Sequence, residues 1–331
     1  MCLLISILLF ACKKGSDGSN VANSNSYHIV GKAIYYQDKP AQLIGCNALH
    51  VFGAGSSDMR SWQIDIVREF IGNVKETPIS GGVIKDAANT YLYALQTIVD
   101  SNRLNHQVTI LCPFKWDTTA NTDFTGKWPS NTSWWTAYKQ TLAQWALYFK
   151  NQPDVWLEVW NEPYRYDRTD GYTDDIWLTH MNELVGIIRN TGNNNIVVVP
   201  CAEQGQDESV LLTKGQILET YYADILFDIH AYEKWLLASN TAIGSRLQQL
   251  QQQNIPVIFG ETAPMNAGVL MPPASFLDSI YTRGMSVCAW LWKYDENDQD
   301  ALLTTTGKPN NNNNNQWGTL YNTLCLKPRK P

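Results

Sequence analysis

Two glutamates stand at the ends of apolar runs of the kind that form buried strands. Glu162 lies near the end of VWLEVWNEP (155–163), and Glu261 ends IPVIFGE (255–261). Two carboxyl groups that flank one bond, one protonated and one ionised, can cleave a glycosidic linkage. The first protonates the leaving oxygen, while the second attacks the sugar or activates a water. Glu162 and Glu261 are therefore candidate catalytic residues for chemistry on a sugar.

Other polar and aromatic side chains stand at or near the ends of further strand-like runs. They are Asn161 beside Glu162, Arg68 in IVREF, His230 and Tyr232 in DIHAY, and Trp290 in CAWLW. If these runs are parallel strands of one barrel, their carboxyl ends form a single face, and that face carries the chemistry. We expect these side chains to converge around the two glutamates.

The elements that must position these residues alternate along the chain. Eight short runs rich in Val and Ile lie at 43–47, 64–70, 108–113, 155–161, 196–200, 225–230, 256–260 and 286–290. Helix-patterned segments separate them at about 84–103, 133–150, 173–190, 208–222, 241–253 and 273–283. Strands that alternate with helices in this way predict an α/β fold, a single (β/α)₈ TIM barrel.

Shorter features complete the expected catalytic domain, residues 27–331. Residues 28–42 predict an N-terminal β-hairpin that turns at 37–40 and closes the bottom of the barrel. A helical turn is expected near 56–62 and a last helix near 316–325. The asparagine run 310–315 has low complexity and predicts a mobile loop.

The motifs at the two glutamates resemble those of glycoside hydrolase family 5, which belongs to a clan of retaining glycosidases. Asn161-Glu162-Pro163 resembles the acid/base motif on strand four, and Gly260-Glu261 resembles the nucleophile motif on strand seven. The resemblance extends over about 28–325. It implies that Glu162 is the general acid/base and Glu261 the nucleophile. Retaining chemistry further implies carboxyl groups about 5–5.5 Å apart.

The same resemblance implies roles for the five substrate-binding residues. Asn161 would bind the sugar 2-hydroxyl, His230 and Tyr232 match the strand-six pair, and Trp290 would lie beneath the sugar at the cleavage point. Tyr232 would orient Glu261, and Arg68 would keep it ionised, since a neighbouring cation lowers a carboxyl pKa. A structural pairing of Arg68 with Glu158 inside the barrel remains an alternative that does not exclude this role.

The chain departs from the family pattern at strand three, where the family often has a histidine and this sequence reads Pro113-Phe114-Lys115-Trp116. Thirteen tryptophans are present, and most are expected to pack in the core. Trp116 and Trp235 follow strand ends closely, so they are the strongest further candidates for sugar-stacking residues.

Composition excludes several other classes of function. A formal net charge of −6 without a basic run argues against nucleic acid as a partner. The five histidines are scattered singly, which argues against a metal-dependent hydrolase, so we expect neither metal nor other cofactor. Cys46, Cys112, Cys201 and Cys288 lie in or beside apolar runs and are expected to be buried thiols. We expect a monomer.

The sequence thus predicts a retaining endo-β-glycosidase that hydrolyses β-1,4-linked polysaccharides of the mannan or cellulose type by double displacement. Its partner would be the polysaccharide or oligosaccharide substrate. The alternative is a non-catalytic glycan-binding lipoprotein on a barrel scaffold. The choice of glycan stays open, because the loops that bind distant sugars cannot be read from sequence.

The N-terminus predicts export. Residues 1–12 (MCLLISILLFAC) form an apolar segment too short to span a membrane and typical of a signal peptide. LFAC (9–12) resembles a lipobox, in which Cys12 would be lipidated, and 13–26 is a polar tether. The alternative is a buried N-terminal strand or helix. We expect an extracytoplasmic protein, lipid-anchored to a bacterial (outer) membrane or secreted, that meets the membrane only through this anchor.

Overall fold

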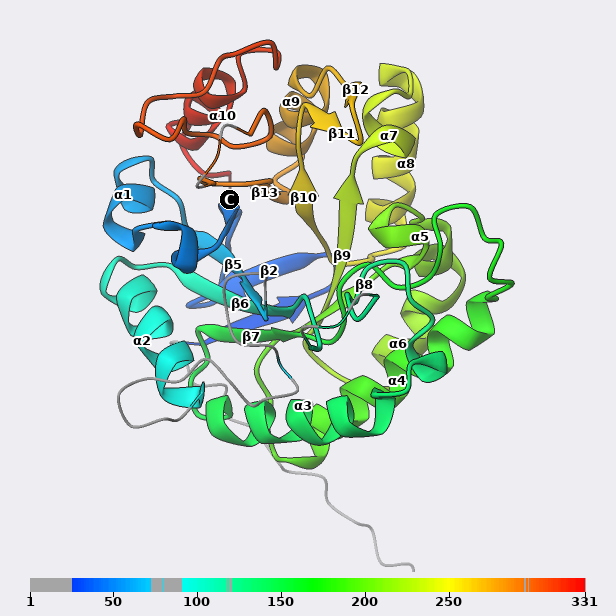
Figure 1. Cartoon of the computed structure of the whole chain (residues 1–331). Helices are drawn as coiled ribbons and strands as arrows, with labels where there is room; N and C mark the ends of the chain where they lie inside the picture. The colour runs from blue at the N-terminus through cyan, green and yellow to red at the C-terminus, as the bar shows by residue number, and fades with distance from the viewer. Residues whose placement is uncertain are drawn as a thin grey trace, which may run out of the picture.

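Eight parallel strands close into a barrel at the centre of the molecule (Figure 1). The computed structural model describes residues 26–72, 79, 91–117, 119, 121–294, 296 and 298–330. In barrel order the strands are β4 (Ile44–Ala48), β5 (Ile66–Ile71), β6 (Val108–Pro113), β7 (Val155–Glu158), β8 (Val197–Pro200), β9 (Ile225–Ala231), β10 (Val257–Thr262) and β13 (Ser286–Ala289). The predicted (β/α)₈ barrel is confirmed.

Helices surround the barrel and follow its strands (Figure 1). They are α1 (Ser56–Ser61), α2 (Tyr91–Leu104), α3 (Trp135–Phe149), α4 (Asp174–Asn190), α6 (Gln216–Tyr221), α8 (Asn240–Gln252), α9 (Ala274–Thr282) and α10 (Trp317–Cys325). The segment predicted at 208–222 is divided between a π-helical stretch at Leu211–Gly215 and α6. Two short helices, α5 (Ala202–Gly205) and α7 (Glu233–Leu236), were not predicted, and 84–90 lies outside the described residues.

A small antiparallel sheet covers the bottom of the barrel, as the sequence predicted. It has three strands, β1 (Tyr27–Val30), β2 (Ala33–Tyr36) and β3 (Lys39–Pro40), and so two hairpins where one was expected. The additional turn uses Gly31, whose φ of 54° suits glycine. Ile34 is buried in an apolar cluster with Ile66 and Trp156 at the lower end of the barrel.

On three of its strands, the barrel interior changes from apolar to charged within two residues. Side chains two residues apart point to the same face, and three strands follow an apolar residue of the lower cluster with a buried charged one. These pairs are Ile66 and Arg68 on β5, Trp156 and Glu158 on β7, and Leu226 and Asp228 on β9. A charged layer therefore separates the apolar bottom from the upper face.

Most tryptophans belong to the core between strands and helices, as expected. Trp116 and Trp235, the two candidates for exceptions, belong to this core as well. The Trp116 ring stacks on Trp134 at 5.5 Å between centroids. Trp235 is fully buried and meets Phe259 edge-on at 5.1 Å. Trp116, on the loop after β6, and Trp235, in the short helix α7, both pack into the main apolar cluster.

Two further expectations can be compared with the structure. The run 310–315 is not a mobile loop. Asn310 and Asn314 are buried, and the Asn310 amide donates to the carbonyls of Asp298 and Ala301 at 2.7 and 3.0 Å. The predicted burial of four cysteine thiols is confirmed, and among the described residues Cys325 is a fifth.

The N-terminal predictions are not tested by the structure. The signal segment 1–12 with Cys12 and nearly all of the tether 13–26 lie outside the described residues. Within the residues that are described, helices fall short of the length and apolar character needed to cross a membrane.

Candidate active site

A cavity of about 580 Å³ opens at the carboxyl ends of the barrel strands. Five of the seven residues singled out from the sequence line it, namely Asn161, Glu162, Tyr232, Glu261 and Trp290. The other two, Arg68 and His230, have no exposed surface and reach the glutamates from inside the barrel. The structure thus brings all seven together, five facing the cavity and two behind it.

Glu261 lies within β10 and is held by three side chains. Arg68 Nη1 donates to its Oε1 at 2.6 Å, and the Tyr232 hydroxyl donates to its Oε2 at 2.7 Å. His230 Nδ1 lies 3.5 Å from the same Oε2. With only 4% of its surface exposed, Glu261 presents little more than its carboxyl edge to the cavity.

Glu162 lies in the loop beyond β7 with its backbone in the left-handed region, at a φ of 48°. Such a backbone is strained for a residue with a side chain and persists where the surroundings hold it. Here Gly126 N donates to the Glu162 carbonyl at 2.7 Å. On the side chain, Oε1 meets His230 Nδ1 at 2.8 Å. The loop between β6 and α3 therefore fixes the direction in which Glu162 points.

Arg68 binds both Glu158 and Glu261, so the two roles suggested for it occur together. Its Nε and Nη2 donate to the two oxygens of Glu158 at 2.6 and 2.7 Å, while Nη1 reaches Glu261. The amide oxygens of Asn47 and Asn161 each accept from the same guanidinium at 2.9 Å. A planar, fixed fork of donors is suited to orienting several acceptors at once.

The two candidate catalytic carboxyls are close to each other. One oxygen of Glu162, one of Glu261 and a ring nitrogen of His230 all lie within 4.8 Å of one another. Inverting glycosidases need carboxyls about 6.5–9.5 Å apart to admit a water, whereas retaining ones need only about 5–5.5 Å. The spacing agrees with the shorter class.

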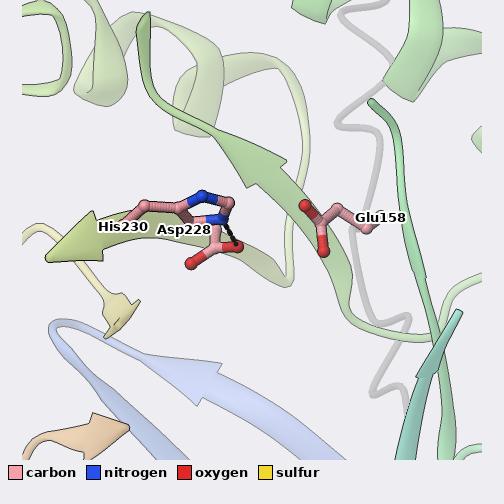
Figure 2. Close-up of side chains that lie close together, drawn as sticks. All are labelled: Glu158, Asp228 and His230. Atoms are coloured by element: carbon pink, nitrogen blue, oxygen red, sulfur yellow. Dashed lines mark hydrogen bonds and ion pairs between the residues drawn. The ribbon is translucent and has the colours of Figure 1, made fainter. Parts of the chain in front are cut away.

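Figure 2 shows a second group of neighbouring side chains, formed by Glu158, Asp228 and His230. Asp228 Oδ2 meets His230 Nε2 at 3.3 Å, and its Oδ1 accepts from Gly260 N at 2.6 Å. The spacing of the three residues resembles that of metal ligands. Both Glu158 oxygens, however, already accept from Arg68, so a metal ion here would have to displace a guanidinium. We interpret the group as part of an ion-pair network.

Comparison with known families identifies this arrangement. A family model described as Cellulase (glycosyl hydrolase family 5) matches residues 51–296, more than half of the chain. The chain belongs to glycosyl hydrolase family 5. The resemblance inferred from the two glutamate motifs is therefore confirmed.

Individual relatives of this family 5 chain are distant. It is 24% identical over 169 residues to a mannan endo-1,4-beta-mannosidase of Cellvibrio japonicus (strain Ueda107), a match spanning 50% of this chain and 38% of that enzyme. Among solved structures, a mannanase catalytic domain from Streptomyces sp. SirexAA-E superposes with a TM-score of 0.70 at 14% identity, covering 97% of this chain and 99% of that one. A Thermomonospora fusca β-mannanase in complex with mannotriose gives 0.65 at 16% identity, covering 84% and 89%. These structures share the fold.

Burial and neighbouring charges shift the pKa values of the ionisable groups in the family 5 site in opposite directions. Burial raises the pKa of Glu261, although His230 and Arg68 both lower it. Burial also raises the pKa of Glu158, to about 7. Burial lowers the pKa of His230, but the carboxylates of Glu261 and Asp228 outweigh this, and its pKa lies well above the ordinary value. The sequence indicated the charged partners of Glu261, whereas its burial follows only from the folded structure.

Several residues of the site were not found from the sequence. Asp228 could have been found from its spacing, because it lies two residues before His230 on one strand and so points to the same face. The others lie on loops, on the short helices α5 and α7, or on the two-residue strand β11 (Met265–Asn266), which are too short or irregular to show a periodicity. The cavity is further lined by Phe114, Thr125, Tyr166, Gln204, Gln206, Glu233, Asn266, Ala267 and Asp300. Phe114 follows the third barrel strand, where the family often has a histidine.

Proposed function

We propose that this family 5 chain is a retaining endo-β-glycosidase that hydrolyses β-1,4-linked polysaccharides by double displacement. The observation that carries the proposal is a pair of carboxyls lining one open cavity, with one oxygen of Glu162 within 4.8 Å of one oxygen of Glu261. One of them, Glu261, is enclosed and held from three sides. The other, Glu162, has 15% of its side chain exposed toward the cavity. A nucleophile must be held in a fixed orientation toward the anomeric carbon, and a proton donor must contact the leaving group.

In the first step Glu162 gives its proton to the glycosidic oxygen while an oxygen of Glu261 attacks the anomeric carbon. The bond from that carbon to the leaving sugar breaks, and a covalent glycosyl-enzyme ester forms. In the second step Glu162 takes a proton from water, whose oxygen displaces Glu261 and restores the free carboxylate. The anomeric configuration is inverted twice and is therefore retained.

Arg68, His230 and Tyr232 act as positioning residues in this mechanism. Arg68 and Tyr232 bind different oxygens of Glu261, so they fix the plane of its carboxylate. Their donors also stabilise the ionised form that must attack. His230 touches both glutamates and is itself held by Asp228, so it sets the relative position of the pair.

The cavity suits a sugar chain better than a compact ligand. Phe114 and Trp290 offer ring surface, and Gln204, Gln206 and Asn266 offer amides that can bind hydroxyls. The curated relative carries a mannan-hydrolysing name. We therefore place β-1,4-mannan first and cellulose-type β-1,4-glucan second as substrates.

Release of reducing ends from β-mannan, carboxymethyl-cellulose, xyloglucan and laminarin tests the proposal. We expect activity on one of the two β-1,4 classes and at least a 10³-fold loss in both Glu162→Gln and Glu261→Gln. Glu183→Gln on the outer helix α4 serves as the matched control and should keep wild-type activity. A folded wild-type protein inactive on all four glycans would favour the non-catalytic glycan-binding alternative.

The stereochemical course gives a separate test of double displacement. Proton NMR of the first product released from a short β-1,4-oligosaccharide should show the β-anomer before mutarotation. An initial α-anomer would mean direct attack by water and would overturn the nucleophilic role of Glu261, even if hydrolysis itself is confirmed.

We also infer that the protein works outside the cytoplasm, anchored through a lipid on Cys12. Polysaccharides are too large to enter a cell, so an enzyme that hydrolyses them must act outside the cytoplasm. The support is the apolar segment 1–12, its LFAC ending and the polar residues that follow it.

A further inference from the structure

Thr125 lines the cavity from a loop that leaves the end of β6 and then returns to it. Two backbone hydrogen bonds pair the outgoing and returning segments. Trp116 N donates to the Thr122 carbonyl at 2.9 Å. Phe124 N donates to the Phe114 carbonyl at 3.0 Å. Phe114 directly follows β6 and also lines the cavity, but its ring cannot form ordinary hydrogen bonds. Thr125 therefore brings a hydroxyl to a part of the wall that is otherwise apolar.

The backbone around Thr125 is bound to the segment that carries Glu162. On one side of Thr125, the Trp160 indole donates to the Phe124 carbonyl at 2.8 Å. On the other side, Gly126 N donates to the Glu162 carbonyl at 2.7 Å. Thr125 lies between these two contacts, so its place relative to the candidate acid/base is fixed from both directions along the chain.

The Thr125 hydroxyl stands at the end of a chain of hydrogen bonds that begins at Arg68. Arg68 Nη2 donates to Asn161 Oδ1 at 2.9 Å, and Asn161 Nδ2 donates to Thr125 Oγ1 at 2.8 Å. A guanidinium has donors only, so the end of the Asn161 amide that faces Arg68 must be its oxygen. The amide N–H then points toward Thr125, whose hydroxyl oxygen accepts it. The charge of Arg68 thus sets the direction of both bonds.

The O–H of Thr125 remains available for a further partner. A threonine hydroxyl has one hydrogen to donate, and the bond from Asn161 occupies only one of its lone pairs. Among the described residues, that bond is the one that the Thr125 side chain makes. The side chain is only partly buried, and it faces the cavity. Because hydrogen bonds in a chain polarise one another, an O–H at the end of a chain that begins at a cation is a strengthened donor.

We propose that Thr125 is a substrate-binding residue, and that its hydroxyl donates a hydrogen bond to a hydroxyl oxygen of the sugar held between Glu162 and Glu261. This inference rests on the proposed function, since it names a contact within the same cavity. It adds a donor whose direction Arg68 sets through Asn161. Arg68 therefore serves the sugar as well as the nucleophile, although it has no exposed surface of its own.

Kinetics of Thr125→Val and Thr125→Ser on the preferred β-1,4-oligosaccharide test the contact. Val has nearly the shape of Thr without its hydroxyl. It should lower kcat/KM about 5- to 50-fold, because the Asn161 N–H and the bound sugar hydroxyl both lose a partner. Ser restores the hydroxyl and should recover most of this loss. Thr132→Val is the matched control, since its hydroxyl donates to the Pro129 carbonyl within the same loop at 2.8 Å, and it should keep wild-type kcat/KM. Equal kcat/KM for wild type and Thr125→Val would overturn the inference.

Aryl glycosides that lack one sugar hydroxyl at a time distinguish a contact with the sugar from mere support of Asn161. If Thr125 donates to one hydroxyl, the loss caused by Thr125→Val should shrink on the analogue that lacks this hydroxyl. On the other analogues the loss should remain in full. A uniform loss on every analogue would mean that the hydroxyl only holds Asn161 in place, and the contact would be rejected.

Binding without turnover separates this inference from the proposed function. Titration of mannotetraose and cellotetraose into Glu162→Gln, followed by tryptophan fluorescence, reports affinity alone. If wild type hydrolyses nothing but affinity falls about 5-fold or more on adding Thr125→Val, the proposed function fails and the contact stands. If wild type is active and affinity is the same with and without Thr125→Val, only the contact fails.

Discussion

At the scale of single residues, the reactivity of Glu261 depends on two opposing effects on its pKa, its burial and its hydrogen-bonding and charged neighbours. Enclosure raises its pKa, while Arg68, His230 and the Tyr232 hydroxyl favour the charged form. The ionised form attacks, so activity is lost as the pH falls through this raised pKa. The acidic limb of kcat/KM should therefore lie above the ordinary carboxyl value of about 4.3.

Tyr232→Phe should move that limb further toward neutral pH, because one donor to the ionised Glu261 is removed. A hydrogen bond to a charged group contributes about 1.5–3 kcal/mol, which corresponds to roughly one to two pH units. The pH profile of kcat/KM for the two proteins checks this. Tyr221→Phe on the outer helix α6 should leave the limb in place. If the acidic limb of the Tyr232→Phe profile is unchanged or moves to lower pH, the role of the hydroxyl is contradicted.

At the scale of elements, Gly260 shows why the nucleophile motif pairs a glycine with the glutamate. A Cβ on Gly260 would lie 2.2 Å from Asp228 Oδ2 and 2.3 Å from its Oδ1. The neighbouring strand thus uses the space that glycine leaves, and the register of β10 against β9 shifts between Ile258 and Glu261. Asp228 accepts the Gly260 N–H and so locks the backbone just before Glu261.

Gly260→Ala should therefore lower activity at least 100-fold and destabilise the fold, because Asp228 must move and Glu261 moves with it. Gly244→Ala is the matched control, since a Cβ there meets only Arg283 Nη2 at 3.7 Å, in the middle of α8. That variant should be more stable by about 0.5–1 kcal/mol. Thermal unfolding and kcat/KM of both variants provide the measurement. Wild-type activity in Gly260→Ala would show that the strand tolerates the change.

The sequence predicts those parts of the fold and the site whose side chains recur at a regular spacing along a strand or helix. The strands and the inward-facing Arg68 and Glu158 repeat at two residues, so their shared layer could be predicted. The asparagine run 310–315 was misjudged, because composition suggested mobility, whereas carbonyls earlier in the same connection between β13 and α10 accept from its amides. Asp300 has no local pattern at all. Its place depends on Trp317, which reaches it only through the folded chain.

The small N-terminal sheet is an element for stability rather than for catalysis. Ile34 is buried at the bottom of the barrel, with the charged layer between it and the glutamates. Ile34→Ala should reduce the free energy of unfolding by about 2–4 kcal/mol, as truncation of a buried side chain does, and leave kcat unchanged at a temperature where the protein is folded. Urea unfolding and initial rates test this. A fall in kcat matching the loss of stability would mean that the bottom of the barrel and the site are coupled.

At the scale of the whole molecule, the barrel separates its two ends. The described chain enters at Ser26 and β1, where Tyr27 packs edge-on to Trp156 in the lower cluster, 5.5 Å between ring centroids. The cavity with Glu162 and Glu261 opens at the opposite, carboxyl ends of the strands. The start of the described chain and the cavity thus lie at opposite ends of the barrel.

This arrangement bears on the proposed lipid anchor at Cys12. Burying acyl chains contributes about 0.8 kcal/mol per CH₂, so several chains on one cysteine hold a protein at a membrane without a spanning helix. Fractionation of cells expressing wild type and Cys12→Ala should find wild type in the membrane fraction and the variant released from it. Because the attachment is remote from the cavity, both forms should hydrolyse soluble substrate at the same rate per molecule. Wild type in the soluble cytoplasmic fraction, or Cys12→Ala still bound to membranes, would overturn the anchor, while unequal rates would show that the tether reaches the active site.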